Sequence, residues 1–158
     1  MRTLYFTALT TGILSAIWAF VASQFDLLSW AGFLGCTAYF AYPKEGFKGL
    51  VVTIATIMSG VIWALAIIYG SQLFNDSAIF GYAVTGVIAF VMCVQAKSTL
   101  LAYIPGTFIG ACTIFAAQGD LTQTILSLIL GILFGYSMKM SGLWICLLYT
   151  SPSPRDPK

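Results

Sequence analysis

The sequence carries very little charge for its length. Only 8% of its 158 residues are charged, whereas soluble domains contain about 25%. Hydrophobic residues make up 59%, and the mean hydropathy is +0.94. A surface with so few charges must face an apolar medium. The composition therefore predicts an all-α, polytopic membrane protein that contacts the lipid bilayer and has no nucleic-acid partner.

Several residues and motifs that support chemistry are also missing. Histidine is absent, which excludes imidazole metal ligands and imidazole proton shuttles. Cys36, Cys93, Cys112 and Cys146 lie in apolar runs without CxxC spacing, so we expect small buried hydrophobic side chains. We find no GxSxG elbow, metal-ligand cluster or phosphate-cradling loop. The sequence predicts a protein that is not an enzyme and binds neither a metal nor a cofactor.

The hydrophobic residues gather into six runs that we predict to be transmembrane helices. A helix needs about 20 apolar residues to cross roughly 30 Å of hydrocarbon. The runs are Leu4–Ala22, Leu27–Tyr42, Gly49–Tyr69, Ala78–Val94, Leu100–Ala117 and Thr122–Met138. The first resembles a signal peptide, but its length favours a retained helix. None of the six contains Asp, Glu, Lys, Arg or His, which argues against a proton relay through a buried carboxylate and against a voltage sensor.

The charges between these runs predict the orientation of the chain. Short cytoplasmic loops are enriched in lysine and arginine. Arg2, Lys44, Lys48, Lys97 and Lys139 all fall at one side of a six-span arrangement. The charged residues in the connections at the other side are Asp26, Asp76 and Asp120, and none of them is basic. We therefore expect both termini to lie in the cytoplasm.

Two stretches in the two halves of the sequence read almost alike. GFLGCTAYFA begins at Gly32 and TFIGACTIFA begins at Thr107. The identities are Phe33, Gly35, Phe40 and Ala41 in the first, and Phe108, Gly110, Phe115 and Ala116 in the second. Gly60 in the third run corresponds to Gly131 in the sixth run, at a slightly different spacing. Three spans per half predict an inverted repeat of residues 1–75 and 76–145, because an odd number of spans reverses the second copy. A six-helix bundle whose central helices converged on small residues is the alternative.

Small residues and one proline mark predicted contact faces. Gly106 and Gly110 form a GxxxG motif, and so do Gly131 and Gly135, which lets helix backbones approach closely. Pro105 and Gly106 lie inside the run Leu100–Ala117 and predict either a break in the helix or a mild kink.

Aromatic residues follow the repeat at helical spacing. Phe33, Thr37 and Phe40 share one helix face, and Phe108, Cys112 and Phe115 repeat it. One hypothesis is that the two faces meet and form an aromatic constriction near the midplane. Ordinary packing of large rings against glycines is the commoner arrangement and stays the alternative. Trp18 and Trp63 lie deep in their runs and are expected to pack between helices, where each indole N–H needs a partner.

The neutral spans favour a channel or transporter for a small neutral or weakly polar solute. A membrane protein that binds a partner without transporting anything is the competing interpretation, and a homo-oligomer fits either one.

The last residues differ in character from the rest. Residues 146–156 resemble the translated adapter of a sequencing library, so we expect 146–158 to be non-native and 1–145 to form the transmembrane domain. A short Pro-rich cytoplasmic tail is the alternative.

Four long stretches resemble a known family. LLSWAGFLGCTAYFAYPKEGFKGL, IPGTFIGACTIFAAQGD, GYAVTGVIAFVMCVQAK and LGILFGYSMKMSGLW are similar to the YcdZ-like bacterial inner-membrane proteins, a domain of unknown function. The resemblance spans about residues 4–144. It implies a multi-pass protein of the bacterial inner membrane, without an established substrate. It supplies no catalytic or binding residues.

Overall fold

The structure is a computed structural model that describes residues 2–72, 78–118 and 121–150. This part of the chain consists of α-helices joined by short connections, together with one turn of 3₁₀ helix. The elements are α1 (Arg2–Gln24), α2 (Ser29–Ala41), α3 (Gly46–Gln72), α4 (Ala78–Val94), η1 (Gln95–Lys97), α5 (Ile104–Ala116) and α6 (Leu121–Thr150). Asp76, Asp120 and residues 151–158 lie outside the described residues.

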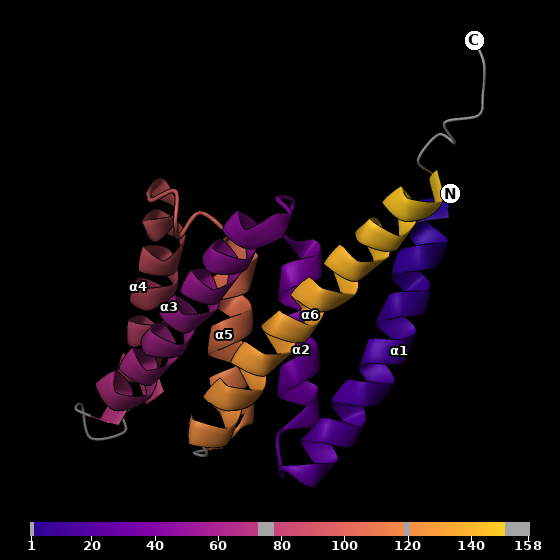
Figure 1. Cartoon of the computed structure of the whole chain (residues 1–158). Helices are drawn as coiled ribbons and strands as arrows, with labels where there is room; N and C mark the ends of the chain where they lie inside the picture. Colours follow the sequence, from indigo (N-terminus) through magenta and orange to yellow (C-terminus); the bar gives the residue numbers. More distant parts are fainter. Residues whose placement is uncertain (1, 73–77, 119–120, 151–158) are drawn as a thin grey trace, which may run out of the picture.

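Successive helices alternate in direction, so α2 and α5 run opposite to one another (Figure 1). The start of α1 and the end of α6 meet at the same end of the molecule (Figure 1). There the rings of Phe6 and Tyr149 stack with their centroids 5.7 Å apart. Close by, the Thr3 hydroxyl lies 3.2 Å from the Cys146 sulfur.

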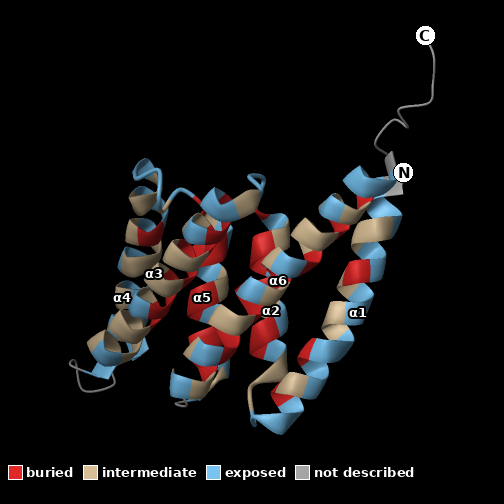
Figure 2. Ribbon diagram, viewed as in Figure 1, coloured by how far each residue is buried: buried red, intermediate tan, exposed pale blue. Residues whose placement is uncertain are grey.

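The two short helices each pack on a long helix from the other half of the chain. α2 packs against α6, and α5 packs against α3. α1 then covers α6, while α4 covers α3. Figure 2 shows buried residues concentrated on α2, α3, α5 and α6, whereas α4 is mostly exposed or intermediate. Tyr39, Ile57, Leu128 and Ile132 are fully buried and form the middle of this core.

The helices confirm the expected all-α class in the described residues, and except for α4 their bounds differ from those of the expected runs. Four helical stretches are long and apolar enough to cross a bilayer: Thr3–Gln24, Gly46–Gln72, Ala78–Lys97 and Leu121–Tyr149. α2 and α5 have 13 residues each, which corresponds to about 20 Å at 1.5 Å per residue. They are shorter than the expected runs Leu27–Tyr42 and Leu100–Ala117. α6 continues well past Met138, the residue at which the sixth run was expected to end.

Candidate functional site

The glycines of the two similar stretches lie where the backbones of two helices touch. A methyl group added at Gly35 on α2 would lie 2.5 Å from the Leu128 carbonyl oxygen on α6. One added at Gly110 on α5 would collide with the Ile57 carbonyl oxygen on α3. Only glycine allows these backbones to touch, because any side chain would occupy the space of the neighbouring carbonyl.

A second pair of glycines makes the matching contacts from the long helices. A methyl group at Gly131 would collide with the Gly32 carbonyl, and one at Gly60 with the Thr107 carbonyl. Gly135 faces the backbone of Cys36. The faces that carry Gly106, Gly110, Gly131 and Gly135 are therefore helix contact faces, as the small-residue spacing predicts.

Pro105 corrects one expectation from the sequence. α5 begins at Ile104, so Pro105 and Gly106 occupy its first turn and lie at its end rather than in its interior. Proline is well suited to this position, since the first backbone N–H groups of a helix have no intrahelical partner. The expected break in a continuous helix is therefore absent at Pro105. The Gly106 backbone instead packs beside Tyr103 and the Thr56 hydroxyl.

The aromatic faces of α2 and α5 point outward in the single chain. Phe33 is 42% exposed, Phe108 is 40% exposed and Phe115 is 45% exposed. Phe40 is half-buried, while Thr37 and Cys112 are exposed. The chain does not bring Phe33, Thr37 and Phe40 against Phe108, Cys112 and Phe115 in an enclosed constriction. Both faces are left uncovered on two neighbouring, antiparallel helices.

The cysteines divide into two kinds. Cys36 and Cys146 are buried, as expected, but Cys93 and Cys112 are exposed on α4 and α5. The expectation that all four are buried is therefore wrong for Cys93 and Cys112, because apolar helix faces in a membrane protein also face outward. This difference leaves a thiol on the uncovered face of α5.

A hydrogen-bonded cluster around Gln95 is a polar feature that the sequence did not single out. Its side-chain oxygen accepts hydrogen bonds from the Ser59 hydroxyl at 2.7 Å and from the Trp63 indole at 2.9 Å. Its side-chain amide donates to the Thr107 hydroxyl at 2.9 Å. The cluster joins η1 to α3 and α5 beside a cavity that Ser59, Trp63 and Gln95 help to line. The sequence indicated only that the deeply placed Trp63 indole needs a hydrogen-bond partner. It did not identify Gln95 as that partner.

The indole partners themselves confirm the expectation for the two deep tryptophans. Trp63 packs between helices and donates to Gln95, while Trp18 is buried and donates to the Ser29 carbonyl at 3.2 Å. Trp18 also lies against Gly32, where an added methyl group would collide with its ring.

Several buried hydroxyls are paired within the protein, whereas the buried Thr11 hydroxyl on α1 has no hydrogen-bond partner among the described residues. Thr53, Thr56 and Thr113 donate to carbonyls of their own helices. Ser127 on α6 accepts the backbone N–H of Leu28 at 2.9 Å. The hydrogen-bonding capacity of these four hydroxyls is therefore met at least in part without a solute or water. Four cavities lie between the α2–α3 and η1–α5 connections, between α3 and η1, between α3, α5 and the start of α6, and between α1 and α6. None of these four is lined by both α2 and α5.

The basic residues gather at one end of the molecule. Lys139, which was expected to follow the sixth span, lies within α6, because this helix continues past it to Thr150. Its ammonium group lies 3.4 Å from the Glu45 carboxylate and 5.8 Å from the centroid of the Tyr39 ring. The ion pair explains how a cation is tolerated well inside a long apolar helix.

Comparison with known proteins places the chain in a family. Residues 8–143, which run from α1 into α6, match the model for a protein of unknown function, DUF1097. The chain belongs to this family. It is 59% identical to the inner membrane protein YcdZ of Escherichia coli strain K12 over 156 residues, covering 99% of this chain and 96% of that protein.

Two further relatives extend the comparison. The inner membrane protein YcdZ of Salmonella typhimurium strain LT2 is 57% identical over 145 residues, covering 92% of this chain and 91% of that protein. The uncharacterized protein YahC of Escherichia coli strain K12 is 28% identical over 157 residues, covering 90% and 92%. No solved structure matches. The DUF1097 match and the long apolar helices together make the chain an integral inner-membrane protein.

Proposed function

We propose that this DUF1097 protein crosses the inner membrane six times and allows a small neutral or weakly polar solute to pass. In this proposal the passage is lined by the uncovered faces of α2 and α5, between copies of the chain. The observation that carries it is the pair of short, antiparallel helices whose faces with Phe33, Thr37, Phe108 and Cys112 are exposed in the single chain.

The length of these helices supports a protein or water environment for that face. At about 20 Å, each is shorter than a hydrocarbon layer of about 30 Å. The backbone before α5 is irregular from Ser98 to Tyr103. That connection turns at the end of the bundle, and a helix shorter than the hydrocarbon layer is accommodated by thinning of the bilayer or by oligomerisation. A second copy that covers α2 and α5 would form such an oligomer.

Reciprocal contacts support two inverted halves, 1–75 and 76–145. Gly35 on α2 faces Leu128 on α6, and Gly110 on α5 faces Ile57 on α3. The two glycines are 75 positions apart, and the two partners are 71 positions apart. The other pair of contacts, Gly131 with Gly32 and Gly60 with Thr107, has the same offsets. Gly131 lies 10 positions after the start of α6, whereas Gly60 lies 14 positions after the start of α3. An inverted duplication in which α6 begins about one turn closer to its glycine than α3 does therefore accounts for both offsets.

The charges support a neutral solute and an orientation. No carboxylate occurs inside α1–α6, and Lys139 is paired with Glu45. The described lysines lie toward one end of the bundle and Asp26 lies at the other (Figure 1). The excess of positive charge at one end supports cytoplasmic termini.

The two exposed cysteines allow a matched test. We would prepare one variant that keeps only Cys112 and another that keeps only Cys93, with the remaining cysteines changed to alanine. A water-soluble methanethiosulfonate should modify Cys112 and lower solute flux in proteoliposomes. Cys93, on the outer helix α4, should be spared because lipid excludes the reagent.

Replacing both Phe40 and Phe115 by alanine (F40A/F115A) should raise the flux of larger neutral solutes. Equal protection of both cysteines together with no flux of any neutral solute would contradict the proposal.

A second function, a partner-binding membrane protein, is favoured by the close backbone contacts between α2 and α6 and between α3 and α5, which leave no room for a side chain at Gly35 or Gly110. In that case the face of α2 and α5 still binds a second copy or a partner. Cys112 would then be protected only in the assembled state, and purified protein would give no flux.

A further inference from the structure

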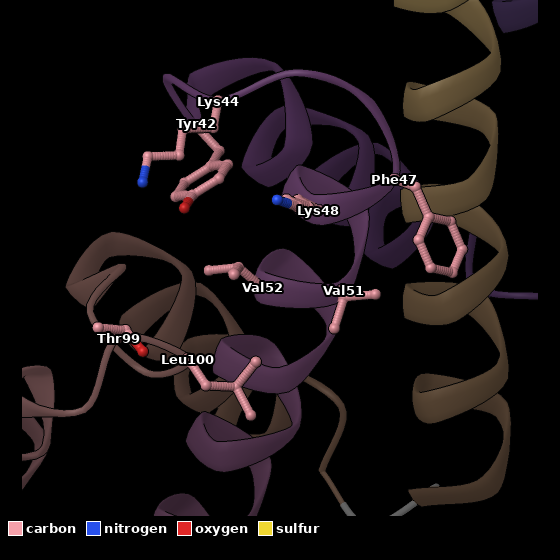
Figure 3. A pocket seen from close by; sticks show the side chains of 8 residues that line it. All are labelled: Tyr42, Lys44, Phe47, Lys48, Val51, Val52, Thr99 and Leu100. Carbon is pink, nitrogen blue, oxygen red and sulfur yellow. The ribbon is translucent and has the colours of Figure 1, made fainter.

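We propose that the cavity between the α2–α3 connection and the η1–α5 connection binds the headgroup and the upper acyl chain of an anionic phospholipid. The cavity has a volume of about 390 Å³ and opens at the end of the bundle that carries the lysines. Tyr42, Lys44, Lys48 and Thr99 provide its polar lining. Figure 3 shows the Tyr42 hydroxyl with the Lys44 and Lys48 nitrogens around the same open space.

The two lysines leave this cavity with an uncompensated positive charge. Lys44 and Lys48 are exposed and form no ion pair with any residue that the structure describes. Glu45 is the acid between them in sequence, and it is paired with Lys139 on α6 instead. Lys48 also lies in the first turn of α3, where the helix dipole adds to the attraction for an anion. An anionic group would therefore be drawn to the polar rim.

The remainder of the cavity is apolar and continues along the side of the bundle. Val51, Val52 and Leu100 line it below the lysines (Figure 3). Val51 is 40% exposed and Leu100 is 46% exposed. A phosphate between the lysines would place the glycerol and the first methylene groups of an acyl chain against these side chains.

The charged rim and the apolar remainder of the cavity together favour a lipid over a soluble phosphate. A soluble phosphate would use the lysines and Tyr42 but would leave the apolar lining uncovered. A phospholipid uses both parts, and the bilayer presents it at the level of a juxtamembrane basic cluster. Tyr42 is only 9% exposed and its ring stacks edge-on with Tyr103 at 5.0 Å, so its position is fixed before a ligand arrives.

The test compares matched lysine variants by native mass spectrometry of the purified full-length protein. The detergent-solubilised protein is titrated with phosphatidylglycerol and, separately, with phosphatidylcholine. The double variant K44Q/K48Q should bind phosphatidylglycerol more weakly by roughly fivefold per lysine removed. K97Q removes a lysine at the same end that does not line the cavity, and it should leave the affinity unchanged. Phosphatidylcholine should bind all variants alike.

Two further measurements distinguish a phospholipid from a soluble phosphate as the ligand. L100Q should weaken phosphatidylglycerol without changing the binding of glycerol phosphate or inorganic phosphate. If the soluble phosphates bind as tightly as phosphatidylglycerol, a lipid site is excluded. An equal loss in K97Q and K44Q/K48Q would show a diffuse surface charge effect and would also overturn the proposal. Thermal unfolding of each variant in the same detergent checks that these exposed substitutions leave the fold intact.

Discussion

At the scale of single residues, glycines determine how closely the helices approach. Gly60, for example, allows α3 to touch the Thr107 carbonyl on α5. Gly86 on α4 has the opposite environment, because it is exposed and nothing lies within 4 Å of an added methyl group. The two glycines share a helical setting and differ in what they contact.

This contrast predicts different costs for the same substitution. Gly60→Ala should lower the stability by roughly 1–3 kcal/mol, because the new methyl group forces two backbones apart. Gly86→Ala should be neutral or slightly stabilising, since alanine favours helix by about 1 kcal/mol over glycine. Thermal unfolding of both variants in one detergent measures the difference. Equal midpoints for the two variants would show that the α3–α5 contact is looser than described.

The polar residues show what a sequence conveys about a single side chain. Trp18 and Trp63 were expected to need partners, because a buried indole N–H is costly to leave unpaired. The identity of those partners depends on tertiary structure. Gln95 is distant from Trp63 and Ser59 in sequence, and only the turn at η1 brings its side chain to them. A lone glutamine at the end of an apolar run gives no signal of that contact.

At the scale of elements, the start of α5 explains the role of Pro105. Residues 98–103 turn at the end of the bundle, and α5 begins only at Ile104. Hydropathy alone placed the start near Leu100, because Leu100 and Leu101 are as apolar as the helix itself. α4 carries no such ambiguity, and its observed bounds are those of the expected run Ala78–Val94.

Pro105 should therefore be easy to replace. Pro105→Ala is expected to change stability by less than about 1 kcal/mol, because no intrahelical hydrogen bond is gained or lost in the first turn. Ile109→Pro, one turn further along α5, should cost about 3 kcal/mol or more. Chemical or thermal unfolding of the two variants tests this. A larger loss of stability for Pro105→Ala than for Ile109→Pro would mean that Pro105 lies in the interior of a longer helix.

At the scale of the whole molecule, the number of helices, their order and their alternating directions were predictable from hydropathy alone. The packing of α2 on α6 and of α5 on α3 was not, since small residues identify a contact face without identifying its partner. The aromatic residues show the same limit. Phe33 and Phe108 match in the two similar sequence stretches, but they are 42% and 40% exposed and are therefore not enclosed in a constriction within the single chain.

The distribution of charge gives a prediction about the whole chain in its membrane. In a background in which the natural cysteines are replaced by alanine, Gln24→Cys and Ser98→Cys place exposed thiols at opposite ends of the bundle. An impermeant maleimide should label Gln24→Cys in cells with a permeabilised outer membrane, and Ser98→Cys only after lysis. The physical reason is that Lys44, Lys48 and Lys97 accompany Ser98, and basic connections are retained on the cytoplasmic side. Labelling of Ser98→Cys from outside would reverse the orientation. Labelling of both thiols from outside would mean that one of the three helices between them, α2, α3 or α4, does not cross the membrane.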